Sequence, residues 1–166
     1  YLGTEAQLRA AGLWHLPALA PWRSAIADGA VYLEAVEGGV RLATGDVVLN
    51  TDAAVALRPT GMDRAAVLAR GLERMGTPFD MHFDATDDSA LFCAELIGEM
   101  YEGPPLPRMP VALPGRETIL IDAIVADALA GELPFSLVGY VKAHPTGGAS
   151  ALSATDLARD IRTAWP

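Results

Sequence analysis

The sequence predicts an α+β fold in a single domain, residues 1–166, with an antiparallel sheet packed against helices. Residues 30–36 and 53–57 are short apolar segments that end at Gly or Pro, as strands do. Residues 63–75 and 91–101 instead repeat apolar side chains at the spacing of amphipathic helices. A further strand-like segment follows only at 135–141, so strands and helices do not alternate regularly. This order indicates an α+β layer arrangement.

Length, charge and cysteine content exclude several classes of protein. A chain of 166 residues can bury a core of its own without disulfides or metals. No stretch approaches the roughly 18 uncharged apolar residues that a membrane span needs, so a soluble protein without a transmembrane segment is expected. The net charge of −9 argues against a nucleic-acid partner. The single cysteine excludes an internal disulfide and a multi-cysteine metal site.

The first 60 residues combine one helix with several strand candidates. Residues 4–7 have the spacing of a capping box, which predicts a short helix to Ala11. Two prolines interrupt residues 14–22, which are expected to be extended or looped. The strand at 30–36 should turn at a Gly-Gly pair into a second strand from Val40. Residues 47–49 are another strand candidate.

The remaining elements follow from caps, breakers and periodicity. Asp63 is the expected N-cap of the first central helix, and residues 77–89 form an acidic loop before the second. Five prolines make residues 104–114 an extended surface crossing. The other expected elements are a buried helix over 118–129, with 119–121 as an alternative strand, a Gly/Pro loop over 144–150, and a last helix from a cap at 153–156 to near Trp165.

Cys93 is the candidate nucleophile. It lies where the acidic loop meets a helix, and the unpaired N–H groups of a first helical turn favour a thiolate. The backbone N–H of Cys93 would also be placed to donate to a developing oxyanion. The alternative is an inert core cysteine, because a free cysteine between apolar neighbours is usually buried.

The cysteine segment also resembles a known family. The matching residues are Gly76, Pro78, Phe79, Asp80, Asp87, Asp88, Leu91, Phe92, Cys93, Ala94, Glu95, Leu96 and Tyr101. This pattern is similar to the signature of the permuted papain-like families related to NlpC-type peptidases, especially the YaeF/YiiX-type amidases. The Glu-Ala turn after Tyr32, the segment 56–59 and the last helix are similar as well, so the resemblance spans roughly residues 10–165.

The resemblance implies a circularly permuted papain-like fold and a bacterial cysteine amidase or peptidase. Its mechanism would be thiolate attack on an amide or ester carbonyl, followed by a covalent acyl-enzyme. No cofactor and no metal would be required. The family usually begins with a Gly-Asp strand, which is not found upstream of His15. The resemblance thus implies that an N-terminal strand is lost or lies outside the chain.

The resemblance assigns the catalytic partners of Cys93 to His15 and Glu34. His15 would be the base, although Pro17 interrupts the strand expected there, and Glu34 would hold the imidazole in place. His82 has two alternatives: a surface histidine, or a metal ligand with Asp80, Asp84, Asp87 or Asp88. His144 is expected to be exposed and uninvolved.

Other residues around the cysteine have supporting roles. Glu95 is expected to accept backbone hydrogen bonds and so support the loop. The aromatic side chains of Tyr32, Phe79 and Tyr101 either line a substrate cleft or belong to the core.

Three functions remain open at this point. The first is an amidase or peptidase for a peptide-like or acylated substrate, including cell-wall peptides. The second is an acyltransferase that moves a lipid acyl chain with the same thiol, with residues 104–114 walling a lipid channel. The third is a catalytically inactive papain-like binding module. The bacterial cytoplasm and the cell envelope are both compatible with the sequence, and any oligomeric state is.

Overall fold

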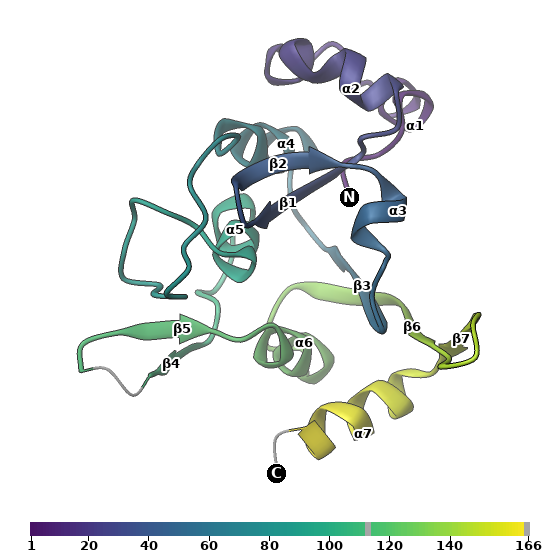
Figure 1. Cartoon of the computed structure of the whole chain (residues 1–166). Coiled ribbons are helices and arrows are strands. Elements are labelled where there is room, and N and C mark those ends of the chain that lie inside the picture. Colours follow the sequence, from purple (N-terminus) through teal and green to yellow (C-terminus); the bar gives the residue numbers. More distant parts are fainter. Residues whose placement is uncertain (112–113, 165–166) are drawn as a thin grey trace.

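The computed structural model describes residues 1–111 and 114–164, and it confirms a mixed α+β fold with antiparallel sheets (Figure 1). The elements in chain order are α1 (Glu5–Ala10), η1 (Pro17–Trp22), α2 (Arg23–Ala27), β1 (Tyr32–Val36), β2 (Gly39–Ala43), α3 (Gly45–Val48), β3 (Ala53–Pro59), α4 (Arg64–Glu73), α5 (Cys93–Met100), β4 (Arg108–Pro110), β5 (Glu117–Ile119), α6 (Ile121–Ala130), β6 (Phe135–Ala143), β7 (Ala149–Leu152) and α7 (Ala154–Ala164). The finer arrangement, a permuted papain-like fold, stays a prediction.

The start of the chain follows the predicted capping box but not the predicted loop. The Thr4 hydroxyl accepts from the Gln7 N–H, and the Gln7 side chain accepts from the Thr4 N–H, which confirms helix α1. Residues 14–22, predicted to be extended or looped, instead contain the 3₁₀ helix η1. Pro17 is its first residue, where a fixed φ and a missing N–H do no harm. Leu19 in η1 is fully buried, so packing stabilises this short helix.

The β1–β2 hairpin is confirmed, but the strand expected next to it is wrong. The two strands pair antiparallel, with Glu34 opposite Arg41. Residues 47–49 belong to helix α3 and its end. Val47 and Leu49 are 50% and 56% exposed, so they have no neighbouring sheet to cover. A short apolar run does not distinguish a strand from a helical turn.

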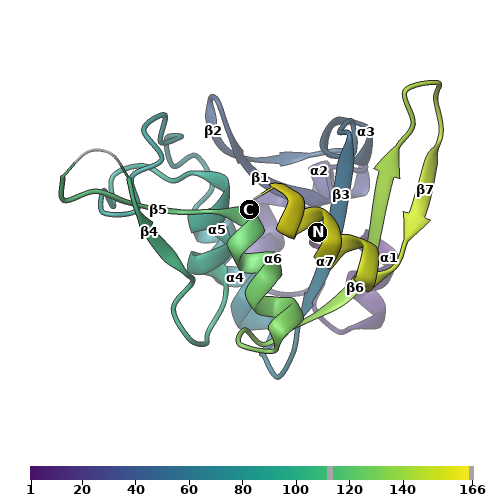
Figure 2. The same ribbon diagram turned by 90° about the horizontal axis from the view of Figure 1, so that it is seen from below.

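A second sheet joins segments far apart in the sequence. Its order is β3-β6-β7, all antiparallel, with an irregularity in the β3 register at Ala56 and Leu57. Helices α6 and α7 contact each other and β6, and they lie over one face of the sheet (Figure 2). Val125, Tyr140 and Leu157 are the buried residues of that layer.

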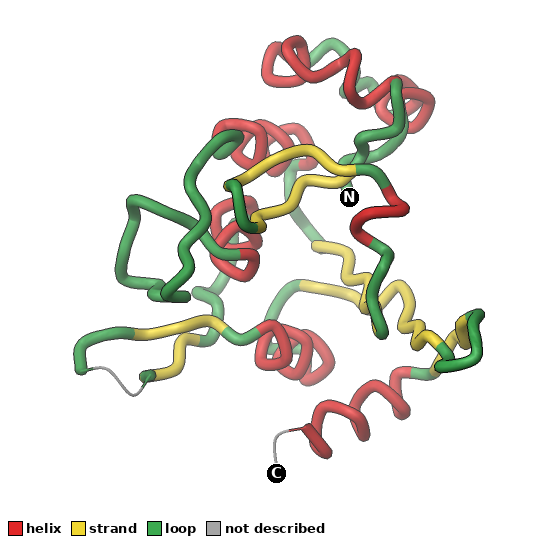
Figure 3. Tube along the Cα trace, viewed as in Figure 1, coloured by secondary structure: helices red, strands yellow, loops and turns green. Residues whose placement is uncertain are grey.

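The central helices begin close to their predicted positions. Asp63 caps α4 by accepting from the Ala65 N–H at 2.9 Å. Residues 118 and 119, expected to start a helix, pair with β4 as part of β5, so of the alternative strand 119–121 only Ile119 is confirmed, and α6 begins at Ile121. The predicted surface crossing includes β4, and its residues 112–113 lie outside the described residues. Strands, helices and the loops between them are distinguished along the trace in Figure 3.

The last helix is also capped as predicted. The Ser153 and Asp156 side chains each accept from the other's backbone N–H, and α7 follows directly. Its predicted end near Trp165 falls outside the described residues. Among the residues that the structure describes, no helix has the length and apolar character needed to span a bilayer.

Gly39 anchors the β1–β2 hairpin to the segment before α5, and we expect Gly39→Ala to destabilise the protein strongly. Its φ of +104° suits glycine, and an added Cβ would lie 2.6 Å from the Thr77 carbonyl oxygen. The neighbouring Val40 N–H donates to the same oxygen, so this contact cannot simply open. The expected loss is about 3 kcal/mol of unfolding free energy, measured by urea denaturation.

Gly38 provides the matched control for this substitution. It also has a positive φ, but an added Cβ would meet nothing within 4 Å. Gly38→Ala should therefore cost only about 1 kcal/mol, for the backbone conformation alone. Equal losses for the two variants would show that the contact with Thr77 has no effect.

Candidate functional site

Cys93 is held at the junction of the acidic loop and α5. The Leu91 N–H donates to the Pro78 carbonyl at 2.9 Å, and the Asp80 N–H donates to the Leu91 carbonyl at 3.2 Å. These bonds place the chain before the helix beside residues 78–80. Phe92 is extended, and its N–H donates to the Glu95 carboxylate at 3.1 Å. The predicted supporting role of Glu95 is thereby confirmed.

Cys93 is exposed as a residue, which argues against the alternative of an inert core cysteine. The buried residues around it are Leu91, Phe92, Ala94 and Leu96. Cys93 is the first residue of α5 and, unlike these neighbours, it is exposed. The apolar residues on either side of Cys93 are therefore core residues themselves, whereas Cys93 is not.

The direction of the thiol pKa shift differs from the sequence prediction. Desolvation by the surrounding protein raises the pKa of Cys93, and it outweighs the lowering by the backbone N–H groups of Ala94 and Cys93. The residue is exposed as a whole, yet neighbouring groups remove enough water from the sulfur to disfavour the anion. The N–H groups in the first turn of α5 therefore lower the pKa of this thiol by less than desolvation raises it.

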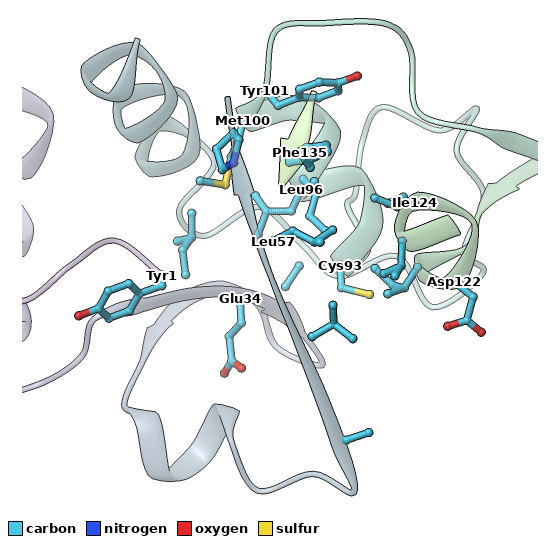
Figure 4. Close-up of a pocket in the computed structure, with 18 of the residues that line it drawn as sticks. Tyr1, Glu34, Leu57, Cys93, Leu96, Met100, Tyr101, Asp122, Ile124 and Phe135 are labelled. Carbon is cyan, nitrogen blue, oxygen red and sulfur yellow. The ribbon is translucent and has the colours of Figure 1, made fainter. Parts of the chain in front are cut away.

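Cys93 lines a cavity of about 870 Å³ between the β1–β2 hairpin, the β3 sheet, α5 and α6 (Figure 4). Most of its lining is apolar. In Figure 4, Tyr1 and Asp122 lie at opposite ends of the drawn lining, and the Cys93 sulfur is on the side of Asp122. A cavity of this size falls in the usual range for small-molecule sites.

Glu34 lines the same cavity as Cys93, as expected for two members of one site. Its carboxylate accepts from Arg41 Nε at 2.9 Å, and its side chain is 16% exposed. The two residues are direct cross-strand partners, so the hairpin register sets this ion pair. The contact that holds Glu34 in the structure is therefore Arg41, and its role toward a histidine stays a prediction.

The structure does not bring His15 to this cavity. His15 is exposed in the turn between α1 and η1, and it is absent from the residues that line the cavity. The strand predicted at this point is not formed. The chain makes a turn and then enters η1, which begins at Pro17. The assignment of His15 as the base stays a prediction based on the resemblance.

The other two histidines are exposed and line no part of the cavity either. The His82 N–H donates to the Asp80 carboxylate at 2.7 Å. The His144 ring lies 2.8 Å from the Ser150 hydroxyl, in the turn between β6 and β7.

The acidic loop satisfies its carboxylates within the protein. Asp80 and Asp84 are buried, and Asp80 accepts from the N–H groups of His82 and Asp84. Asp84 accepts from Thr86 and pairs with Arg116 at 3.2 Å. The Thr86 hydroxyl is the main reason that the pKa of Asp84 lies below its ordinary value. In the described part of the chain, no group of three His, Cys, Asp or Glu residues could hold a metal ion.

Sequence reasoning missed the acidic residues that α6 and α7 contribute to the cavity. Asp122 and Asp160 both line it, together with Tyr140 from β6. The Asp160 carboxylate accepts from the Tyr140 hydroxyl at 2.8 Å and from Lys142 at 3.0 Å. No local pattern could have revealed this group, because β6 and α7 meet only through the tertiary fold.

Of the three aromatic candidates for a cleft, one lines the cavity. Tyr101 is among its lining residues. Tyr32 packs against the core cluster beneath α1 and α4, and Phe79 packs between the two clusters around Phe92 and Leu96.

Glu95 should make the stability of the protein depend on pH. Burial raises the pKa of its carboxyl from 4.5 to about 7, and Asp80 adds to the rise. Between these two values the folded state keeps a proton that the unfolded state loses, so the stabilisation is complete below about pH 4.5 and is lost as pH rises through about 7. After allowance for solvent screening, we expect unfolding free energy to fall by about 1 kcal/mol between roughly pH 5 and 8.

Glu95→Gln is the variant that tests this expectation. Glutamine keeps an oxygen that can accept from the Phe92 N–H but does not titrate. The difference in unfolding free energy between variant and wild type, measured by urea denaturation at each pH, should therefore grow with pH. A constant difference would mean that Glu95 does not titrate in this range.

No family model, no curated protein and no solved structure matches the chain.

Proposed function

We propose that the protein is a cysteine-dependent amidase or peptidase that forms an acyl-enzyme on Cys93. The observation that carries the proposal is the position of Cys93: the residue is exposed, it is the first residue of α5, and it lines a cavity large enough for a small substrate. A reactive cysteine needs an accessible sulfur beside backbone N–H donors, and both are present. The family resemblance supports the same residue independently.

In the proposed reaction the Cys93 sulfur attacks a carbonyl carbon of the substrate. The N–H groups at the start of α5 are available to a developing oxyanion, because no helical carbonyl precedes them. The carbon–nitrogen bond then breaks, the amine leaves with a proton, and water hydrolyses the thioester to a free acid. Transfer to another acceptor in place of water would make the same site an acyltransferase.

The thiol proton must pass to a base, and the cavity carboxylates are poor candidates. A glutamate ordinarily has a pKa near 4.3, roughly 4 units or more below that of a cysteine, so proton transfer to it costs about 6 kcal/mol. An imidazole, with an ordinary pKa near 6.5, removes about half of this cost. The proposal therefore keeps His15 as base and Glu34 as its partner, although no imidazole lines the cavity in the structure.

The proposal is tested by mass spectrometry of the protein during turnover of acyl p-nitroanilides at about pH 7 and 9. We expect an acyl adduct on the peptide that contains Cys93, formed faster at the higher pH because the pKa of this thiol is raised. Product analysis then separates a free acid, from hydrolysis, from an acylated acceptor. Adducts only on residues other than Cys93 would overturn the proposal.

A second candidate function is a binding module without catalysis. It is favoured by two findings: none of the three histidines lines the cavity, and desolvation raises the pKa of the thiol. Such a module would bind its ligand reversibly and equally well after Cys93→Ala, and it would never form an adduct. The experiment above separates the two functions.

A further inference from the structure

We infer that the cavity beside Cys93 takes an unbranched alkyl chain, the acyl part of the substrate. The position of its carbonyl group at the sulfur rests on the proposed function. The binding of the chain itself does not, because it follows from the lining of the cavity alone. The substrate class is therefore a fatty acyl amide with a neutral or cationic amine portion.

The lining presents aliphatic carbon from several elements. Figure 4 shows Leu57 of β3, Leu96 of α5 and Ile124 of α6 gathered on one side of Cys93. Val55, Val67, Ile97, Val125, Leu157 and Ile161 add to this surface. Val55, Leu57, Val67, Ile97 and Ile161 are only half-buried, so an apolar occupant would remove their exposed carbon from water, while the other aliphatic side chains form a buried wall behind them.

The shape of the cavity favours a chain over a compact group. It extends from β1, at Leu33 and Glu34, past α5 to Leu157 and Ile161 on α7. Tyr1 and Asp122, which both line it, lie well apart in Figure 4. An extended chain can follow this path through the volume of about 870 Å³, whereas a compact group would reach only part of the lining.

The charges of the lining disfavour an anionic ligand. No Lys, Arg or His is among the lining residues in the described part of the chain, whereas Glu34, Asp122 and Asp160 are. Glu34 is paired with Arg41, and Asp160 with Tyr140 and Lys142. A ligand carboxylate or phosphate would find no cationic side chain among the described lining residues, and it would meet like charge. An amine, in contrast, is compatible with the nearby carboxylates.

The covalent step balances without a further reactant except water. The Cys93 sulfur bonds to the acyl carbon, and the carbon–nitrogen bond breaks as the amine takes up the thiol proton. Water then adds to the thioester, which releases a fatty acid and restores the thiol. The alkyl chain stays in the cavity through both steps.

Binding of neutral n-alkanamides, from butanamide to decanamide, to Cys93→Ala tests the inference without any chemistry. Calorimetry should show affinity rising about four-fold for each added methylene until the cavity is full. Decanoate should bind at least about ten-fold more weakly than decanamide, because of its charge. An affinity independent of chain length, or tighter binding of decanoate, would overturn the inference.

Cavity-filling variants locate the bound chain. Val55→Trp and Ile97→Trp place bulk in the lining from different elements, and each should weaken decanamide at least about ten-fold while butanamide changes little. Val138→Trp is the matched control, because Val138 is 52% exposed on β6 and is not a lining residue. Thermal unfolding of each variant checks folding. Unchanged decanamide affinity in both folded cavity variants would place the chain elsewhere and refute the inference.

The same compounds separate this inference from the proposed function. If alkanoyl p-nitroanilides give no adduct on Cys93 while alkanamides bind with the expected dependence on length, the inference stands and the amidase proposal fails. If short acyl groups form the adduct as fast as long ones, the amidase proposal stands, and the inference that the cavity binds an alkyl chain is refuted.

Discussion

Cys93→Ala is expected to lower amidase turnover by at least about 10³-fold, because no other residue can supply the sulfur that carries the acyl group. The chain contains a single cysteine, so no second thiol can replace it. The substitution should change unfolding free energy by less than about 0.5 kcal/mol, since the side chain is exposed. Turnover and urea denaturation of the same preparation therefore separate a chemical effect from unfolding.

Cys93→Ser is the matched control for the shape of the site. The hydroxyl is similar in size but far less acidic than a thiol, so turnover should again be lost while alkanamide binding remains. Persistence of turnover in both variants would exclude Cys93 as the nucleophile.

His15→Ala extends this test to the predicted base. His15 is exposed, so loss of its side chain should leave folding intact. If His15 is the base, turnover at about pH 7 should fall by 10²-fold or more and recover partly at higher pH, where hydroxide deprotonates the thiol. An unchanged pH profile would remove His15 from the mechanism.

Phe92→Ala is expected to have the largest effect on stability, a loss of about 3 to 5 kcal/mol in unfolding free energy. Phe92 is 1% exposed and belongs to the core cluster that joins α5 to β5 and α6. Its removal leaves a cavity next to the first turn of α5, so Cys93 should also lose its fixed position. The measurement is urea denaturation, with alkanamide affinity of the folded protein as a second readout.

Phe83→Ala is the matched control for this change. Its ring contacts that of Phe92, with centroids 5.5 Å apart, but Phe83 is 45% exposed. Loss of this side chain should cost only about 1 kcal/mol. A similar loss in both variants would mean that burial does not decide the contribution of Phe92.

Local features of the sequence were enough to predict most helices and strands. The caps at Thr4, Asp63 and Ser153 depend only on residues two or three positions away, and all three are confirmed. The β1–β2 hairpin follows from its glycine turn. Such signals act over a single turn of chain, so they are visible without the rest of the protein.

The errors occur where short apolar runs had no local signal to decide their conformation. Residues 17–22 and 45–48 are helical, although their sequences have no helical periodicity. Their conformation depends on their surroundings in the folded protein. Residues 117–119 form a strand because β4 lies beside them. Propensity is too weak to decide such segments against tertiary packing.

The sequence by itself determined the α+β class, the position of Cys93 at a helix start and the nearby carboxylates, since each depends on neighbouring residues. Only the tertiary structure decided that Cys93 is exposed, that Glu34 shares its cavity while His15 does not, and that Asp122 and Asp160 border it. The physical reason is distance along the chain. A cavity forms where β1, α5, α6 and α7 meet, and contacts between such remote segments leave no pattern in any one of them.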